Sequence, residues 1–299
     1  MLAFALLSGL VAALAFLVWP RAVGGAPDAP ADAVARGAYM ARIAGCAGCH
    51  TAAPADGAEP VPFAGGRRLK TPFGTFVSPN ITPHSEAGIG GWGDAQFLAA
   101  MRHGIGPDGR PLYPVFPYGS YTLMRDEDVL SIAAWLRTLP PSDRVDGRHD
   151  VAFPLSWRPL VNGWRLLFLR EGPFVPDPAR DERWNRGAYL VRAVAHCGEC
   201  HTPRNAVGAL DHRRELAGTR DGPEGEKVPN ITPDATGIAD WSEGDIVTLL
   251  RTGAKPDFDN VQGSMAEAVR HGLSTLTDED ARAIAAYLKA LPPIANSVR

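Results

Sequence analysis

The chain has 299 residues, about the length of two average domains. Its hydrophobic fraction of 45% and charged fraction of 21% are those of a folded protein, which excludes wholesale disorder and a protein with many membrane spans. The formal net charge of −3 lacks the positive excess needed to neutralise phosphates, so we expect no nucleic-acid partner.

The chain begins with an apolar segment. Residues 2–19 carry no charge, and Pro20 and Arg21 end the run. As a helix rising about 1.5 Å per residue, this run approaches the thickness of a bilayer core. A cleaved signal peptide is an alternative, but it usually has a basic segment before its apolar core, which is missing here; a buried helix is a third interpretation. We therefore predict a transmembrane anchor over residues 1–21 and, from its Ala, Gly, Pro and Asp content, a flexible tether over residues 22–35.

The rest of the chain contains one unit twice. Residues 36–51 recur at 186–202, residues 79–83 recur at 229–233, and a Leu-Pro-Pro sequence closes each copy. Such self-similarity indicates a duplicated domain. We predict one domain over residues 36–141, a second over 186–299, and a linker over 142–185.

The predicted elements of each domain are helices. Apolar residues at helical spacing predict closing helices over residues 126–139 and 278–291, and further helices are predicted over 95–103, 187–195 and 243–251. No segment alternates convincingly as a strand does, so the predicted fold class is all-α. In the linker, the apolar residues between Trp157 and Phe168 fall on one helix face; they predict interdomain packing or, alternatively, a docking surface for a partner or membrane.

All four cysteines lie in two Cys-x-x-Cys-His motifs, formed by Cys46, Cys49 and His50 and by Cys197, Cys200 and His201. Two thiols at this spacing can form thioethers with the two vinyl groups of haem, while the adjacent histidine ligates the iron. Zinc sites and redox disulfides also use Cys-x-x-Cys, but two such motifs within a duplicated unit favour haem. We therefore predict two covalently bound haem c groups.

The second axial ligand decides whether a haem carries electrons or binds a small molecule. In the second domain we predict Met265, on a loop before the closing helix, with His271 as the local rival. In the first domain the equivalent loop has no methionine at the corresponding position, and we predict Met124, immediately before the closing helix. The alternatives there are Met101, a bis-histidine iron using His84 or His103, and an open site.

Residues 36–293 resemble the c-type cytochrome subunits of bacterial periplasmic alcohol and aldehyde dehydrogenases, through both haem motifs, the two Pro-Asn-Ile-Thr-Pro segments and the Tyr-Pro-x-Phe-Pro-Tyr loop. The resemblance implies two tandem class I cytochrome c domains behind the anchor. Because haem is attached outside the cytoplasm in such proteins, it also implies haem domains in the periplasm and an anchor in the bacterial inner membrane. Many members carry three haem motifs where this chain has two, and many place Met where this chain has Phe116.

The resemblance further implies a function: an electron carrier that makes and breaks no bonds itself. Its partners would be a dehydrogenase, as donor, and a respiratory acceptor, either quinone or a terminal oxidase. Two alternatives remain at this point. A dihaem peroxidase would need an open or displaceable ligand at the first haem. A subunit of a terminal oxidase would need two membrane spans before the haem motifs, where this sequence predicts one.

Overall fold

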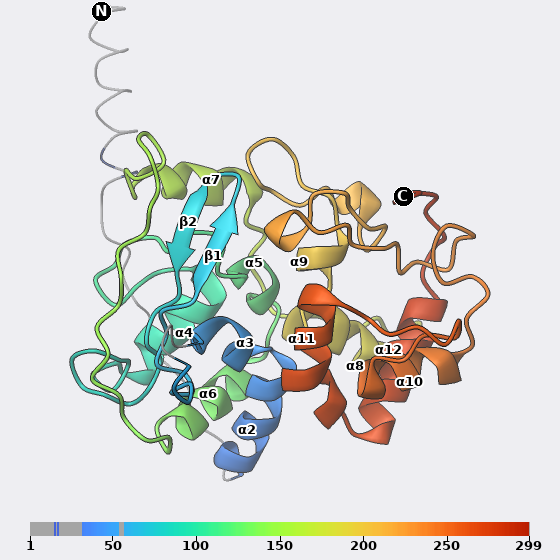
Figure 1. The fold of residues 1–299 in the computed structure, drawn as a ribbon, viewed down its shortest axis with the longest axis horizontal. Coiled ribbons are helices and arrows are strands. Elements are labelled where there is room, and N and C mark those ends of the chain that lie inside the picture. The colour runs from blue at the N-terminus through green and yellow to red at the C-terminus, as the bar shows by residue number, and fades with distance from the viewer. Residues whose placement is uncertain (1–14, 16, 18–31, 54–56, 299) are drawn as a thin grey trace, which may run out of the picture.

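Each of the two repeats folds into a small helical domain, and Figure 1 shows them side by side. The computed structural model describes residues 32–53 and 57–298, together with residues 15 and 17. In this part of the chain no helix combines the length and apolar character required to cross a membrane. The predicted anchor over residues 1–21 and most of the predicted tether lie outside the described residues.

The first domain contains five helices and one hairpin among its described residues. In chain order these elements are α2 (Ala33–Ile43), α3 (Cys46–His50), β1 (Arg68–Thr71), β2 (Gly74–Val77), α4 (Asp94–His103), α5 (Tyr118–Tyr121) and α6 (Asp126–Leu136). The hairpin is antiparallel, with Arg68 opposite Val77 and Thr71 opposite Gly74. The sequence predicted no strand, and the all-α class is therefore corrected to a mostly helical fold. Each strand is only 4 residues long, too short for a clear alternating pattern.

The second domain has its helices in the same order as the first, and its described residues contain no β-strand element. Its helices are α8 (Glu182–Tyr189), α9 (Gly198–His201), α10 (Glu243–Thr252), α11 (Gly263–His271) and α12 (Asp278–Lys289). A π-helical turn, η1 (Leu190–Val194), continues α8, and short 3-10 turns occur at His212–Arg214, Pro223–Gly225 and Leu273–Thr275. The segment before the closing helix, predicted as a loop, is therefore mostly the helix α11.

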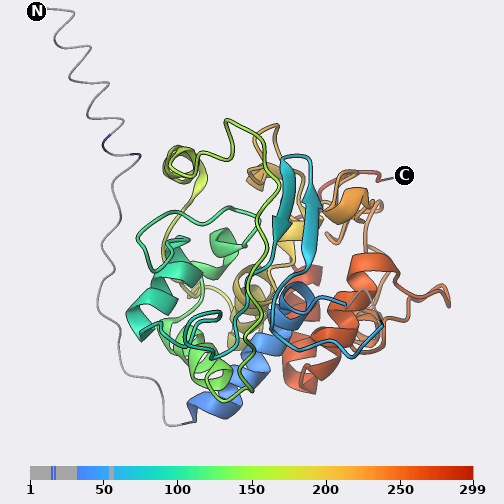
Figure 2. The ribbon, with the colours of Figure 1, turned by 60° about the vertical axis from the view of Figure 1, so that its left-hand side comes forward.

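In both domains the first helix packs across the last, α2 on α6 and α8 on α12 (Figure 2). A glycine makes each crossing possible. A Cβ atom on Gly37 would lie 1.8 Å from the carbonyl oxygen of Ser131, and one on Gly187 would lie 2.0 Å from that of Ala283. The backbones approach this closely because these positions lack a side chain.

The buried apolar side chains form one continuous cluster that spans both domains. Its members lie on both sides of the boundary, and Met40, Leu130, Val191 and Ile284 are each at most 4% exposed. Burial of apolar area, the main stabilising contribution to folding, therefore joins the domains as well as forming each one.

The linker contains one helix, α7 (Leu160–Phe168). Trp164 contacts both domains: its ring meets that of Tyr118 edge-on, with centroids 6.4 Å apart, and its Nε1 donates to the carbonyl of Val207 at 2.9 Å. This agrees with the interdomain packing that the sequence predicted. Leu167, which the pattern placed on the apolar face, is instead 74% exposed, and the neighbouring Leu166 is 70% exposed.

Candidate functional site

The two Cys-x-x-Cys-His motifs form single helical turns, α3 and α9, directly after the first helix of each domain. No disulfide joins any two of the four cysteines. Burial raises the pKa of Cys46 to about 12 and that of Cys197 to about 12, so both thiols are protonated at neutral pH.

Within residues 32–53 and 57–298, no group of three or more His, Cys, Asp and Glu side chains is arranged to hold a metal ion. Each motif instead supplies two thiols and one imidazole, the set of groups that covalent haem requires. The chemistry of the motif residues therefore fits haem c.

The histidine of each motif is held by a backbone carbonyl. Nδ1 of His50 donates to the carbonyl oxygen of Pro79 at 2.8 Å, and Nδ1 of His201 donates to that of Pro229, also at 2.8 Å. Burial lowers the pKa of both imidazoles, so they are neutral at pH 7. With the proton on Nδ1, the lone pair is on Nε2, where an iron ligand needs it.

A repeated loop fixes the position of each accepting proline. Oδ1 of Asn80 accepts from the backbone amide and hydroxyl of Thr82, and its Nδ2 donates to the carbonyl of Ser142. Asn230 binds Thr232 in the same way. Both asparagines are 2% exposed. The repeated Pro-Asn-Ile-Thr-Pro sequence is therefore the support for the motif histidine.

In each domain a glycine with positive φ packs against this loop and binds the backbone carbonyl of the motif histidine. Gly65 and Gly218 donate their amides to the carbonyls of His50 and His201, at 2.8 and 2.7 Å. A Cβ on either glycine would lie within 2.6 Å of the adjacent Pro-Asn backbone, at Pro79 or Asn230. The histidine and its proline partner can pack this closely only because a glycine separates them.

The two methionines predicted as distal ligands occupy different surroundings. Met124 is completely buried, at the turn between α5 and α6. Met265 lies in the first turn of α11, half-buried against the apolar cluster. The structure thus places Met265 on a helix rather than on the predicted loop, and it leaves both ligand assignments as predictions.

The alternative ligands have contacts of their own. Met101 is 6% exposed within the apolar cluster of α4. Nδ1 of His84 accepts from the amide of Ala87 at 3.1 Å, and Nδ1 of His103 lies 3.2 Å from a carboxylate oxygen of Glu171. His271 lies exposed at the end of α11.

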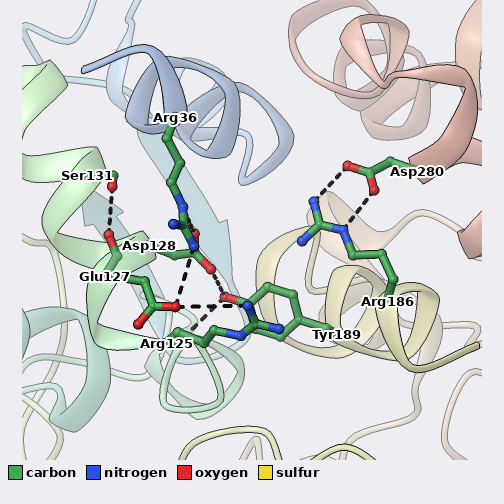
Figure 3. Close-up of polar contacts among 8 residues, drawn as sticks. All are labelled: Arg36, Arg125, Glu127, Asp128, Ser131, Arg186, Tyr189 and Asp280. Carbon is green, nitrogen blue, oxygen red and sulfur yellow. Dashed lines mark hydrogen bonds and ion pairs between the residues drawn. The ribbon is translucent and has the colours of Figure 1, made fainter. Parts of the chain in front are cut away.

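Polar contacts link the first and last helices of each domain and the two domains with each other. Figure 3 shows both arginine–aspartate pairs and the contact of Tyr189 with Asp128. Within each domain, an arginine of the first helix binds an aspartate of the last: Arg36 Nε lies 2.6 Å from Asp128, and Arg186 Nε lies 2.7 Å from Asp280. Both aspartates are buried. Burial opposes ionisation of Asp280, but hydrogen bonds from Arg186 and Tyr39 outweigh it and lower the pKa of the carboxyl group.

A tyrosine from the opposite domain completes each pair. The hydroxyl of Tyr39 donates to Asp280 at 2.6 Å and accepts from the amide of Thr277, the residue that caps α12. The hydroxyl of Tyr189 donates to Asp128 and accepts from the amide of Arg125, the residue before α6. The repeated Arg-Gly-Ala-Tyr sequence therefore binds its own domain through Arg and the other domain through Tyr, a role that the sequence analysis missed although the repeat itself was visible.

Further contacts hold each haem motif against the other domain. Arg67 donates to the carbonyl of Gly48, inside the first motif, at 2.6 Å and to Glu267 of α11 at 2.7 Å. Reciprocally, Ser120 of α5 donates to Glu199, inside the second motif, at 2.7 Å. The two motifs therefore lie at one interface.

The chain matches the family model described as cytochrome c twice, over residues 34–140 and 185–292. It is 48% identical over 265 residues to a "diheme cytochrome c-type" protein of Cereibacter sphaeroides, a match that covers 87% of this chain and 86% of that protein. It is 42% identical over 267 residues to the fructose dehydrogenase cytochrome subunit of Gluconobacter japonicus, covering 88% of this chain and 54% of the relative.

A third relative is the cytochrome c subunit of the quinone-type alcohol dehydrogenase of Gluconobacter oxydans, 36% identical over 299 residues. The match covers 95% of this chain and 60% of that subunit, so the chain spans just over half the length of these two dehydrogenase subunits. This chain belongs to the cytochrome c family, as an electron-transfer protein with two covalently bound haem c groups.

Proposed function

We propose that this two-domain cytochrome c accepts electrons from a periplasmic dehydrogenase and delivers them to the respiratory chain, at quinone or a terminal oxidase. The observation that carries the proposal is the duplicated haem site, whose two motifs lie at one domain interface. The relatives named as cytochrome subunits of fructose and alcohol dehydrogenases support a substrate-oxidising enzyme as the donor.

In this proposal the thiols of Cys46 and Cys49 hold the first haem and those of Cys197 and Cys200 hold the second. Haem supplies reversible one-electron exchange at iron. The protein's part is to hold the proximal imidazoles of His50 and His201 in the required tautomer through the proline carbonyls. Met124 and Met265 are the distal ligands in the same proposal.

The proposed location is the bacterial inner membrane, with a single anchor over residues 1–21 and the haem domains in the periplasm. The uncharged run over residues 2–19 supports the anchor. Within that run, the carbonyl of Leu17 accepts a hydrogen bond from Nδ2 of Asn162 in α7 at 2.7 Å. The proposed domain limits are 36–141 and 186–299, joined by the linker 142–185.

Purification of the tagged full-length protein from its own membranes in mild detergent tests the proposed donor. The readouts are haem staining of native gels and mass spectrometry of the proteins recovered with it. We expect stoichiometric recovery of a dehydrogenase whose substrate reduces both haems. Recovery of the cytochrome alone, with no dehydrogenase able to reduce it, would overturn the assignment.

A further inference from the structure

The residue before each haem motif has a left-handed backbone conformation. In the first domain this residue is Gly45, with φ of 65°, and in the second it is His196, with φ of 41°. Glycine adopts such a φ readily, whereas a residue with a Cβ atom rarely does. The second domain thus has a histidine at a position where glycine would be unstrained. Contacts of the His196 side chain must therefore stabilise this backbone conformation.

The His196 side chain contacts the first domain. Its Nε2 donates to the carbonyl oxygen of Ala44 at 3.2 Å, and its ring meets that of Tyr121 edge-on, with centroids 5.4 Å apart. The Tyr121 hydroxyl donates to the same carbonyl at 3.0 Å and is buried. The Ala44 carbonyl therefore accepts two hydrogen bonds, one from each domain.

This hydrogen bond joins the two haem motifs by a short route through the protein. Ala44 lies two residues before Cys46, and His196 directly precedes Cys197. From the first motif to the second, the route follows covalent bonds to the Ala44 carbonyl, crosses the hydrogen bond to His196, and follows covalent bonds again to Cys197. Only one non-covalent step separates the two cysteines along it.

Neighbouring contacts keep the motifs close on either side of this route. Arg67 binds Gly48 of the first motif together with Glu267 of the second domain, and Ser120 binds Glu199 of the second motif. The junction around His196 therefore lies between the two haem attachment sites.

We propose that His196 is a positioning residue that couples the two haems electronically, through its hydrogen bond to Ala44. This inference rests on the proposed function as a dihaem electron carrier. With haem bound at both motifs, one electron would pass from one iron to the other, and no covalent bond would form or break. A hydrogen-bonded route carries this exchange better than a gap across the interface.

The test uses the purified holoprotein and the variant His196→Gly, which removes the side chain and matches Gly45 in the other domain. A photochemical donor injects one electron into the oxidised protein, and flash spectroscopy follows its redistribution between the haems. Redox titration gives the two midpoint potentials, and small-angle scattering gives the overall dimensions. We expect slower redistribution in His196→Gly, with unchanged potentials and dimensions.

Two further variants separate the proposed role from a structural one. His196→Gln keeps an N–H donor at similar reach and should restore part of the rate. Phe258→Gly relieves the same kind of backbone conformation, φ 65°, at a 99% exposed site, and should leave the rate unchanged.

Three results would overturn the inference: an unchanged rate in His196→Gly, an equal loss in Phe258→Gly, or a slower rate that accompanies separated domains. The measurement needs no dehydrogenase. Failure to find a partner enzyme would therefore overturn the proposed function while leaving this result intact.

Discussion

The imidazole of each haem motif is oriented by the protein backbone. The proline carbonyl accepts from Nδ1, and the buried amides of Asn80 and Asn230 hold the loops that carry the prolines. Partners of this kind fix the tautomer and ring plane of a metal-binding histidine and tune the metal. The two methionines predicted as distal ligands lie in different surroundings, Met124 completely buried and Met265 half-buried in the first turn of α11.

The first prediction at the residue scale concerns these predicted distal ligands. Replacing a methionine ligand by leucine keeps the side-chain volume but removes the sulfur, so Met124→Leu and Met265→Leu should each lower the reduction potential of one haem. Each should also open that haem to carbon monoxide. Redox titration and carbon monoxide difference spectra of the reduced proteins check this. Met101→Leu is the control, and a potential that falls there rather than in Met124→Leu would reassign the ligand of the first haem.

A second residue-scale prediction follows from the lowered pKa of Asp280. The variant Asp280→Asn leaves Arg186 without its charged partner, and we expect a loss of about 3 kcal/mol of unfolding free energy at pH 7. A carboxyl group whose pKa is lower in the folded state stabilises above its unfolded pKa of about 3.9, and this stabilisation is lost as pH falls through the folded value. The difference in unfolding free energy between the wild type and Asp280→Asn should therefore become smaller below about pH 4.

Denaturant titrations of the holoproteins at neutral and acidic pH measure both effects. The exposed Asp240→Asn is the matched control and should change stability little at either pH. If the unfolding free energies of the wild type and Asp280→Asn differ by the same amount at both pH values, the carboxylate charge does not contribute to stability.

At the scale of elements, the crossing of the first and last helices organises each domain. The closing helices begin with acidic residues, Asp126 to Asp128 in α6 and Asp278 to Asp280 in α12, which suit the positive end of the helix dipole. The third acid of each run also binds the arginine of the first helix. One aspartate thus stabilises its own helix terminus and the helix crossing together.

The close backbone approach at this crossing gives a prediction. In Gly187→Ala the new methyl group would lie 2.0 Å from the Ala283 carbonyl oxygen, so the helices must separate, at a cost of about 1–3 kcal/mol or more. Thermal unfolding of the holoprotein measures this loss. Gly119→Ala is a matched control, because that glycine is exposed and helical and a Cβ atom there would have nothing within 4 Å. Equal melting temperatures for Gly187→Ala and wild type would contradict the tight crossing.

At the scale of the whole molecule, the two domains share one apolar core. The apolar cluster crosses their boundary, and each tyrosine of the repeated Arg-Gly-Ala-Tyr sequence reaches an aspartate of the other domain. The haem motifs are consequently held at a fixed interface and not at the ends of a mobile linker. Such an arrangement suits rapid exchange of electrons within one protein.

The corresponding prediction removes both tyrosine hydroxyls. In Tyr39→Phe with Tyr189→Phe, each buried aspartate loses a donor and each helix N-terminus loses an acceptor, a loss of about 1–3 kcal/mol per site. We expect calorimetry to show two separate transitions in place of one cooperative transition. Tyr113→Phe removes a hydroxyl that binds the linker carbonyl of Leu155, and it should keep a single transition. A single unshifted transition in the double variant would mean that the tyrosines do not couple the domains.

The sequence by itself determined the duplication, the haem chemistry and the helical class, because these depend on local spacing: Cys46 to His50 lie within one helical turn, and the closing helices show regular apolar periodicity. It could not reveal the short hairpin or the helix around Met265, where the segments are too brief for a periodic signal.

Only the tertiary structure decided how the domains meet. The roles of Tyr39, Tyr189 and His196 depend on partners far away in the chain, in the other domain. Nothing in the local sequence around a tyrosine or a histidine specifies which distant aspartate or carbonyl it will reach. Those contacts arise only when both domains have folded and buried their shared apolar surface.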